Sequence, residues 1–226
     1  MRGPMHLCFI NPNSTAGMTG KIAEAARAAA RPDTAITALT NADGPPSIQG
    51  PADGALAEPG LLHLIERYSE DFDAFVIACF DDTGLAEARR VTQKPVIGIG
   101  EAAYRQAVRA RLRFSVVTTL SISVPILEEN IEAYGFAPFC AKVRASEVPV
   151  LDLEQPGSAA RERVAAEIAA ALSEDRPNAI VLGCAGMADL AELFSARFGL
   201  PVFDGVAAAV AELEALGAAA EAQARA

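Results

Sequence analysis

A short apolar run that ends in a cysteine occurs twice in this chain of 226 residues. Residues 73–79 read Asp-Ala-Phe-Val-Ile-Ala-Cys, and residues 178–184, which lie 105 positions later, read Asn-Ala-Ile-Val-Leu-Gly-Cys. The same offset brings Asn13 onto Thr118. Self-similarity at a fixed spacing indicates an internal duplication, so we expect two similar halves, each with a cysteine at the end of a buried strand.

Short apolar stretches typical of buried strands alternate with alanine-rich stretches typical of helices along the whole chain. We expect strands at 7–10, 35–39, 74–78, 96–99, 114–117, 139–148, 179–183 and 202–203. We expect helices at 14–30, 61–70, 83–90, 101–111, 124–134, 159–173, 187–198 and 206–216, followed by a frayed or exposed tail at 218–226. This alternation predicts the α/β class: two pseudo-symmetric lobes, each a mainly parallel sheet flanked by helices, with the active site in the cleft between them.

The repeat also suggests where the lobes begin and end. Residues 1–112 are expected to form the first lobe and residues 113–204 the second. The C-terminal stretch, 205–226, either stays with the second lobe or crosses over to the first. Residues 41–60 are rich in Gly, Pro, Asp and Asn, so we expect a long loop there, of the kind that often serves function.

Composition and charge exclude several classes of function. Asp and Glu outnumber Lys and Arg by 29 to 19, and a net charge of −10 repels phosphate backbones, so nucleic acid is not an expected partner. No apolar run reaches the roughly 18 residues that a membrane span needs, and the N-terminus does not resemble a signal peptide, so we expect no membrane contact and a cytoplasmic protein with reduced thiols. The four cysteines form no Cys-x-x-Cys pair and there are two histidines, so a structural zinc site is not expected.

The ends of the predicted strands indicate where a ligand binds. In open parallel sheets, ligands bind beyond the carboxyl ends of the strands. Four segments end a strand and open a helix there: 11–15, 79–83, 118–119 and 184–187. A helix N-terminus has unpaired N–H groups and a partial positive charge, which lower the pKa of a thiol and can hold an oxyanion. If the lobes face each other, Cys79 and Cys184 approach one substrate carbon from opposite sides.

Two opposed thiols suit racemisation of a carbon acid. One thiolate removes the carbon-bound proton, and the other thiol delivers a proton to the opposite face. Backbone N–H groups near residues 80–82, Thr119 and residues 185–186 could stabilise the oxyanion of the planar, enolate-like intermediate. This chemistry requires no metal and no pyridoxal lysine, so we expect no cofactor.

Five motifs lie between residues 10 and 206: Ile10-Asn11-Pro12-Asn13-Ser14-Thr15; Gly44-Pro45-Pro46-Ser47-Ile48 with Gly50 and Asp53; Ala78-Cys79-Phe80 followed by Asp82; Gly183-Cys184-Ala185-Gly186-Met187; and Pro201-Val202 with Asp204-Gly205-Val206. In this order, they resemble the aspartate/glutamate racemase superfamily and, within it, the hydantoin racemase and allantoin racemase branch. The usual run after the first cysteine in that family is Phe-Gly-Asp-Pro, whereas this chain has Phe-Asp-Asp-Thr. Asp81 therefore replaces a glycine, which can alter the turn's backbone, and adds a carboxylate near Cys79 that opposes thiolate formation.

The resemblance implies a cofactor-independent isomerase that acts on a 5-substituted hydantoin or on allantoin. It implies that Cys79 and Cys184 are the acid/base thiols and that the chain forms a homo-oligomer. It also implies substrate contacts from Asn13, from Thr118 or Thr119, and from the turn after each cysteine. The candidate substrate-binding residues are therefore Asn13, Phe80, Asp81, Asp82, Thr118, Thr119, Ala185 and Gly186.

Simpler structural roles and other functions stay open beside this interpretation. The two cysteines could be buried structural thiols, as we expect for Cys8 in its apolar strand, whereas Cys140 is expected in the core or on the surface. Asn13 could cap the first helix, and Asp82 could cap the helix that follows it or orient the neighbouring thiol. The other functions are cis–trans isomerisation of a small dicarboxylate, as in maleate isomerases, and non-catalytic binding of a small molecule in the same cleft.

Overall fold

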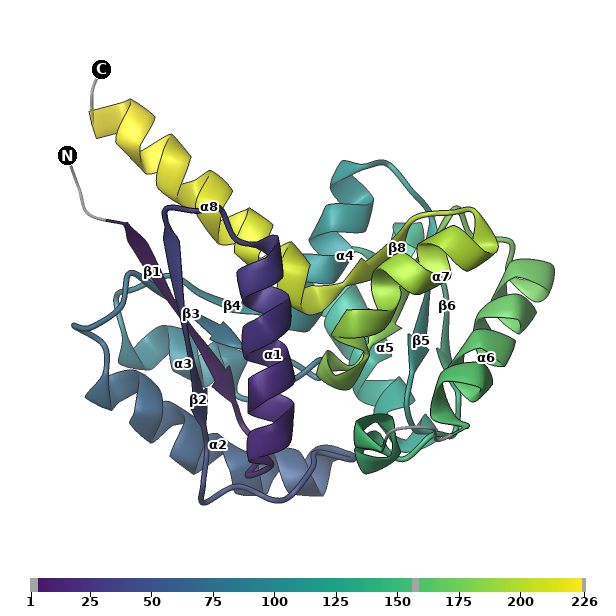
Figure 1. Cartoon of the computed structure of the whole chain (residues 1–226), viewed down its shortest axis with the longest axis horizontal. Coiled ribbons are helices and arrows are strands. Elements are labelled where there is room, and N and C mark those ends of the chain that lie inside the picture. Colours follow the sequence, from purple (N-terminus) through teal and green to yellow (C-terminus); the bar gives the residue numbers. More distant parts are fainter. Residues whose placement is uncertain (1–3, 156–158, 225–226) are drawn as a thin grey trace.

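The computed structural model describes residues 4–155 and 159–224, which form two four-stranded parallel sheets that lie side by side (Figure 1). The first sheet has the order β2-β1-β3-β4 and consists of β1 (Met5–Asn11), β2 (Thr34–Thr40), β3 (Ala74–Ile77) and β4 (Val96–Gly98). The second has the equivalent order β6-β5-β7-β8 and consists of β5 (Phe114–Thr118), β6 (Cys140–Ala145), β7 (Ala179–Gly183) and β8 (Val202–Asp204). The predicted α/β class with two similar lobes is confirmed.

Helices connect the strands in both lobes. They are α1 (Ala16–Ala29), α2 (Pro51–Arg67), α3 (Leu85–Val91), α4 (Ile99–Arg109), α5 (Val124–Ala133), α6 (Ala160–Glu174), α7 (Ala191–Phe198) and α8 (Gly205–Ala224). Short 3-10 helices lie at η1 (Ser121–Ser123), η2 (Ala137–Phe139), η3 (Val150–Glu154) and η4 (Ala185–Leu190). Within the described ranges, none of the helices is both long enough and apolar enough to cross a membrane.

Side chains alternate between the two faces of each sheet, and one of those faces is shared between the lobes. In β1, Phe9 packs into a core that also contains residues of α1, α4 and α8, whereas Cys8 and Ile10 pack against α2 and α3. In β7, Val181 joins the same shared core, whereas Ile180 packs against α6 and α7. The continuous core between the sheets fixes one lobe against the other and so fixes the cleft at the strand ends.

Helix α8 is longer than the sequence analysis predicted. It continues to Ala224, so the tail expected from residue 218 is helical rather than frayed, whereas residues 218–220 and 222–223 are exposed, as expected. Residues 225–226 lie outside the described part. Alanine has the highest helix propensity, which explains why this alanine-rich stretch continues the helix. Figure 1 shows α8 running from the end of β8 back over the first lobe, where Glu214 Oε1 accepts hydrogen bonds from the Arg31 N–H (2.8 Å) and Thr34 Oγ1 (2.7 Å).

The long loop expected at residues 41–60 is also shorter than predicted, because α2 begins at Pro51. Proline suits the first turn of a helix, where its missing N–H has no partner to lose. Gly60 lies in α2 where it faces Asn41: an added Cβ would come within 2.2 Å of Asn41 Oδ1. The Asn41 side chain in turn donates from Nδ2 to the Ala57 carbonyl at 2.9 Å. Pro51 therefore marks a helix start and Gly60 a close approach, and the loop is confined to residues 41–50.

The register of the strands corrects one detail of the duplication. Ile77 and Leu182 are equivalent positions of β3 and β7, and they pair with Ile10 in β1 and with Val117 in β5. The next residue after Ile10 is Asn11, so the structural counterpart of Thr118 is Asn11 rather than Asn13. The equal spacing of Asn13 and Thr118 from their cysteines therefore does not reflect equivalent positions.

Candidate active site

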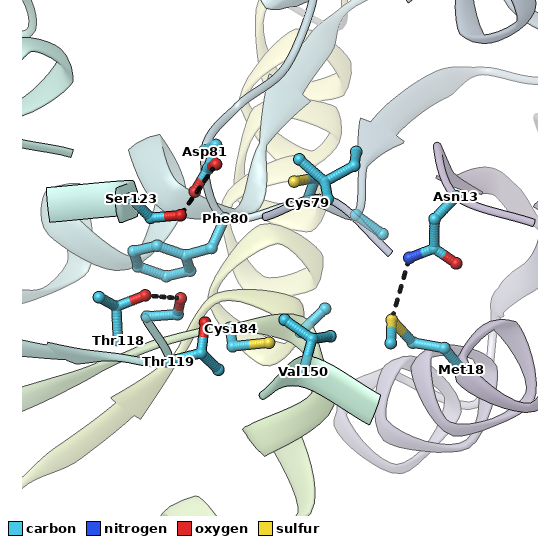
Figure 2. Close-up of a pocket in the computed structure, with 14 residues that line it drawn as sticks. Asn13, Met18, Cys79, Phe80, Asp81, Thr118, Thr119, Ser123, Val150 and Cys184 are labelled. Carbon is cyan, nitrogen blue, oxygen red and sulfur yellow. Dashed lines mark hydrogen bonds between the residues drawn. The ribbon is translucent and has the colours of Figure 1, made fainter. Parts of the chain in front are cut away.

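Residues from both lobes line one pocket at the carboxyl ends of β1, β3, β5 and β7 (Figure 2). The pocket has an empty volume of about 380 Å³, part of it open to solvent. Its lining residues are Asn13, Met18, Ile48, Ala78, Cys79, Phe80, Asp81, Thr118, Thr119, Ser123, Val150, Gly183, Cys184 and Ala185. Eight of the ten residues singled out from the sequence thus come together, and the two that do not are Asp82 and Gly186.

The two thiols lie on opposite sides of this pocket. Cys79 follows β3 and Cys184 follows β7, and Figure 2 shows both side chains directed into the space between the lobes. Both are half-buried, and none of the four cysteines, all within the described residues, forms a disulfide. A substrate carbon between Cys79 and Cys184 would have one thiol on each face.

The surroundings of Cys79 favour its protonated form. Burial raises the pKa of the Cys79 thiol well above its usual value, and the Asp81 carboxylate raises it further. The hydroxyl of Thr83, whose Oγ1 lies 3.6 Å from Cys79 Sγ, and a backbone hydrogen bond from Asp81 lower the pKa in part. The expectation that a helix N-terminus lowers the pKa of this thiol is wrong for Cys79, because α3 begins only at Leu85.

Cys184 has a different backbone setting. It is the N-terminal cap of η4, so a 3-10 helix begins at the next residue, and the Met187 N–H donates to the Cys184 carbonyl at 3.0 Å. The α-helix predicted from residue 187 begins at Ala191 instead. Gly186 lies beside the thiol without lining the pocket: a Cβ there would be 3.7 Å from Cys184 Sγ.

Asp82 lies behind the pocket and ties three elements together. Its carboxylate accepts hydrogen bonds from the Gly100 N–H (2.9 Å), the Glu101 N–H (2.8 Å) and the Tyr134 hydroxyl (2.9 Å). It therefore caps α4 rather than the helix that follows it, and it also reaches α5 of the second lobe. Burial raises the pKa of Asp82 to about 7.

The backbone of this turn is left-handed at Asp82, whose φ is 50°. Asp81, the residue that differs from the family's glycine, does not have positive φ. In this structure, position 81 therefore does not need the conformational freedom of a glycine.

The Asn13 side chain is held by residues of the turn after β1 and by Met18 of α1. Its Oδ1 accepts from Asn11 Nδ2 (2.9 Å) and from the Thr15 N–H (2.9 Å), which fixes the turn after β1. The residue at the cap position of α1 is Thr15, and it makes no side-chain cap hydrogen bond, so the alternative of Asn13 as the helix cap is wrong. The Asn13 amide Nδ2 donates to the Met18 sulfur at 3.2 Å, as drawn in Figure 2.

The two threonines at the end of β5, Thr118 and Thr119, have different surroundings. Thr118 Oγ1 donates to the Gly183 carbonyl at 2.8 Å, which joins β5 to β7 immediately before Cys184. Thr119 follows it and lines the same wall of the pocket. The position of Thr118 in the sheet therefore gives it a structural hydrogen bond in addition to its place at the pocket.

Six lining residues were not singled out from the sequence as substrate contacts: Met18, Ile48, Ala78, Ser123, Val150 and Gly183. Ile48, Ala78 and Gly183 belong to motifs quoted above, which was a usable signal. Ser123 and Val150 lie in the short 3-10 helices η1 and η3, which hydrophobic periodicity does not detect.

Charge is sparse in the pocket. Among the described residues that line it, Asp81 is the only one with an ionisable carboxylate, and none is Lys, Arg or His. The part of the chain that the structure describes contains no group of three or more His, Cys, Asp or Glu side chains arranged to hold a metal ion. The arrangement offers two thiols, one carboxylate, and neutral amide and hydroxyl groups.

Comparison with known proteins places the chain in a family. The family described as Asp/Glu/Hydantoin racemase matches residues 7–213. The chain is 47% identical to the hydantoin racemase of Rhizobium meliloti over 213 residues, which cover 94% of this chain and 88% of that protein. The structure of an allantoin racemase from Klebsiella pneumoniae is 43% identical, with a TM-score of 0.92 over 96% of this chain and 89% of that one.

More distant structures share the fold. A maleate isomerase from Pseudomonas putida S16 superimposes with a TM-score of 0.69 at 19% identity, over 94% of this chain and 93% of that one. At that identity the likeness extends to the architecture alone, whereas the hydantoin and allantoin racemases are similar in sequence over nearly the whole chain. The chain therefore belongs to the Asp/Glu/hydantoin racemase family and is an isomerase of the racemase class.

Proposed function

We propose that this chain racemises a 5-substituted hydantoin or allantoin by proton transfer between Cys79 and Cys184, without a cofactor. The observation that carries the proposal is the position of two thiols on opposite sides of one pocket. The ring class is supported by the relatives, which include hydantoin racemases and allantoin racemases.

The proton transfers follow from the different surroundings of the thiols. Because burial and Asp81 raise the pKa of Cys79 and so favour its protonated form, we assign Cys79 as the proton donor in the starting state, which leaves the role of base to Cys184. Cys184 removes the proton from C5 of the ring, and the electron pair moves into the adjacent carbonyl to give a planar enolate. Cys79 then delivers its proton to the opposite face of C5, which leaves Cys79 as the thiolate and Cys184 as the thiol, ready for the other enantiomer.

Neutral groups of the pocket are proposed to hold the ring. A thioether is a weak hydrogen-bond acceptor, so Asn13 Nδ2 gains by exchanging the Met18 sulfur for a ring carbonyl oxygen. The orientation of the Asn13 amide is set in advance by the two donors at its Oδ1. Thr119 and the backbone N–H groups of Phe80 and Ala185, which follow the cysteines and line the pocket, are proposed to stabilise the oxyanion. The Asp82 N–H is not a candidate, because it donates to the Cys79 carbonyl at 3.1 Å.

The charge of the pocket disfavours the dicarboxylate alternative. Maleate and acidic amino acids each carry carboxylates that need cationic or strongly donating partners, whereas the described lining has no Lys, Arg or His and includes Asp81. A neutral ring avoids this repulsion. A homo-oligomeric state and a cytoplasmic location stay predictions.

Hydrogen–deuterium exchange at C5 tests the proposed function. Single enantiomers of 5-alkylhydantoins and of allantoin are incubated with the reduced protein in D₂O, and optical rotation and deuterium at C5 are followed. We expect both racemisation and exchange above the rates in buffer alone and with the Cys79→Ser/Cys184→Ser double variant. Wild-type protein that is stabilised by a ring but exchanges no C5 proton would contradict the racemase and support a binding protein.

A further inference from the structure

Asp81 combines a fixed backbone with a weakly engaged carboxylate. Its carbonyl oxygen accepts a hydrogen bond from Asn130 Nδ2 at 2.9 Å, which ties the residue to α5 of the second lobe. Its Oδ2 accepts from Ser123 Oγ at 3.4 Å, at the long limit of hydrogen bonding. Two carboxylate oxygens provide about four acceptor positions, so this carboxylate has acceptor capacity left for a ligand.

The pocket places Asp81 and Asn13 at opposite ends. Figure 2 shows Asn13 on one side of the line between the two thiols and the Asp81–Ser123 pair on the other side. When C5 becomes planar between the thiols, the ring and the first atom of the C5 substituent lie in one plane across that line. With a ring carbonyl at Asn13 Nδ2, the C5 substituent extends toward Asp81.

We propose that Asp81 selects hydantoins whose C5 substituent carries an N–H donor, such as a ureido group or an alkylammonium group. This inference rests on the proposed function and names the substrate class within it. A substituent that carries a carboxylate is rejected at the same end of the pocket, because the two negative charges repel each other.

The physical reason for this selectivity is the free energy lost when an unsuitable substituent is placed against Asp81. An apolar substituent placed against Asp81 would remove water from a carboxylate without supplying a donor, which is unfavourable. An N–H donor restores the lost hydrogen bond, and a charged donor adds attraction. No Lys, Arg or His among the described lining residues competes for the carboxylate. Burial raises the pKa of Asp81 to about 6, so the group is still mostly ionised at pH 8.

Two hydantoins of equal size separate this role from a general effect on catalysis. The probes are 5-(3-aminopropyl)hydantoin and 5-butylhydantoin, which differ by an ammonium group in place of a methyl group. We expect wild-type kcat/KM to be higher for the aminopropyl compound, and Asp81→Asn to lower the ratio of the two kcat/KM values by roughly 10- to 100-fold, the effect of one hydrogen bond to a charged group. Any change that Asp81→Asn causes through Cys79 affects both compounds equally and cancels in the ratio.

The control variant is Asp189→Asn, which removes a partly exposed carboxylate that pairs with Arg161 at 2.8 Å, away from the pocket, and is expected to leave the ratio unchanged. A ratio that is the same in wild type and Asp81→Asn would overturn the inference, because Asp81 would then act on the ring or on Cys79. Wild-type preference for the butyl compound would overturn it as well.

A second comparison uses the wild-type protein alone and so does not depend on folding of the variant. We expect 5-(2-carboxyethyl)hydantoin to be racemised more slowly than its neutral amide, 5-(2-carbamoylethyl)hydantoin, by roughly 10-fold or more. Equal rates, or a faster carboxylate, would contradict the role of Asp81. A folded wild-type protein that racemises none of these rings and no allantoin would contradict the proposed function itself, which is a different result from racemisation without selectivity.

Discussion

The turns after Cys79 and Cys184 start at equivalent positions of β3 and β7 and then diverge. After Cys79, residues 80–84 form a turn before α3, and this turn carries two adjacent aspartates. Three hydrogen bonds join it to the second lobe, from Ser123, Asn130 and Tyr134. After Cys184, η4 begins at once with two small residues, and neither carries a charge.

This difference shows what the duplication preserved and what it left free to change. The strand ends hold the thiols opposite each other, whereas the first turn alone carries charge and the three hydrogen bonds to the second lobe. The asymmetry cannot favour one direction of racemisation, because enantiomers have equal free energies and kcat/KM must be equal in both directions. Its effects must appear instead in kcat and KM separately, in substituent selectivity and in the reactivity of each thiol.

Replacing each thiol alone is expected to have the largest effect on the racemisation rate. It also tests whether the two thiols serve opposite faces of C5. Cys79→Ser and Cys184→Ser are each expected to lower the racemisation rate by roughly 100- to 10,000-fold, the contribution of a positioned acid or base. In D₂O each variant should still exchange the C5 proton of one enantiomer, the one whose proton faces the remaining thiol, and the two variants should exchange opposite enantiomers. Chiral chromatography with mass spectrometry measures both.

The control is Cys140→Ser, since Cys140 is half-buried in β6 and does not line the pocket. We expect it to keep racemisation. Exchange of the same enantiomer by Cys79→Ser and Cys184→Ser would show that the thiols do not serve opposite faces of C5.

The first turn should be more sensitive to substitution than the second. Asp82→Asn places an amide NH₂ against groups that are themselves donors, because both carboxylate oxygens of Asp82 accept hydrogen bonds. We expect a loss of about 1–3 kcal/mol in the free energy of unfolding. Urea unfolding at pH 8 is suitable, because the carboxylate is then above the pKa of about 7 to which burial raises it.

Two further variants provide reference values for the free energy of unfolding measured with Asp82→Asn. Tyr134→Phe removes one donor to Asp82 and should cost about 1 kcal/mol. Gly186→Ala in the second turn should cost less, since the new Cβ meets the flexible end of Leu153 at 3.3 Å. Equal stability of wild type and Asp82→Asn would show that the hydrogen bonds of Asp82 to α4 and Tyr134 do not stabilise the fold.

Local patterns in the sequence predicted the features of the two turns that depend on residues close by in the chain. The apolar runs before Cys79 and Cys184 place both thiols at strand ends, and the structure has β3 and β7 there. Proline and glycine led to a wrong loop prediction where a distant contact determines the residue. Gly60 is an example, because the side chain of Asn41 leaves no room for a Cβ there. The bonds of Asp82 to Gly100, Glu101 and Tyr134 also join distant positions, so no local pattern reveals them.

The site shows the same limit. Numerical spacing paired Asn13 with Thr118, but the β1–β3 and β5–β7 registers differ by two residues. The helix expected at 83–90 begins two residues later, at Leu85, after a turn whose left-handed residue is Asp82. Ser123 and Val150 enter the pocket from 3-10 helices that are too short to show a period.

Removing the charge of Asp81 should make Cys79 more reactive. The Asp81 carboxylate raises the pKa of the Cys79 thiol, so Asp81→Asn lowers that pKa and increases the thiolate fraction at any pH below it. We expect alkylation of Cys79 by iodoacetamide at pH 8 to accelerate on the order of tenfold, which corresponds to a shift of about one pKa unit. Mass spectrometry of the alkylated peptides reports each thiol separately.

Cys140 serves as the reference within the same sample, since burial raises its pKa to about 11 without a contribution from Asp81. Its alkylation rate should be unchanged in Asp81→Asn. Parallel acceleration of Cys79 and Cys140 would indicate loosening of the fold rather than an electrostatic effect.

Thr83→Val should change the reactivity of Cys79 in the opposite direction and by less. The Thr83 hydroxyl donates to Cys79 Sγ at 3.6 Å, which stabilises the thiolate and lowers the pKa. Valine keeps the shape and removes the donor, so the pKa of Cys79 rises and its alkylation at pH 8 should slow by about two- to threefold, as sulfur is a weak acceptor. Faster alkylation of Cys79 in Thr83→Val would mean that this hydroxyl shields the thiol from solvent instead of stabilising its charge, and the first turn would then control access to Cys79 rather than its protonation.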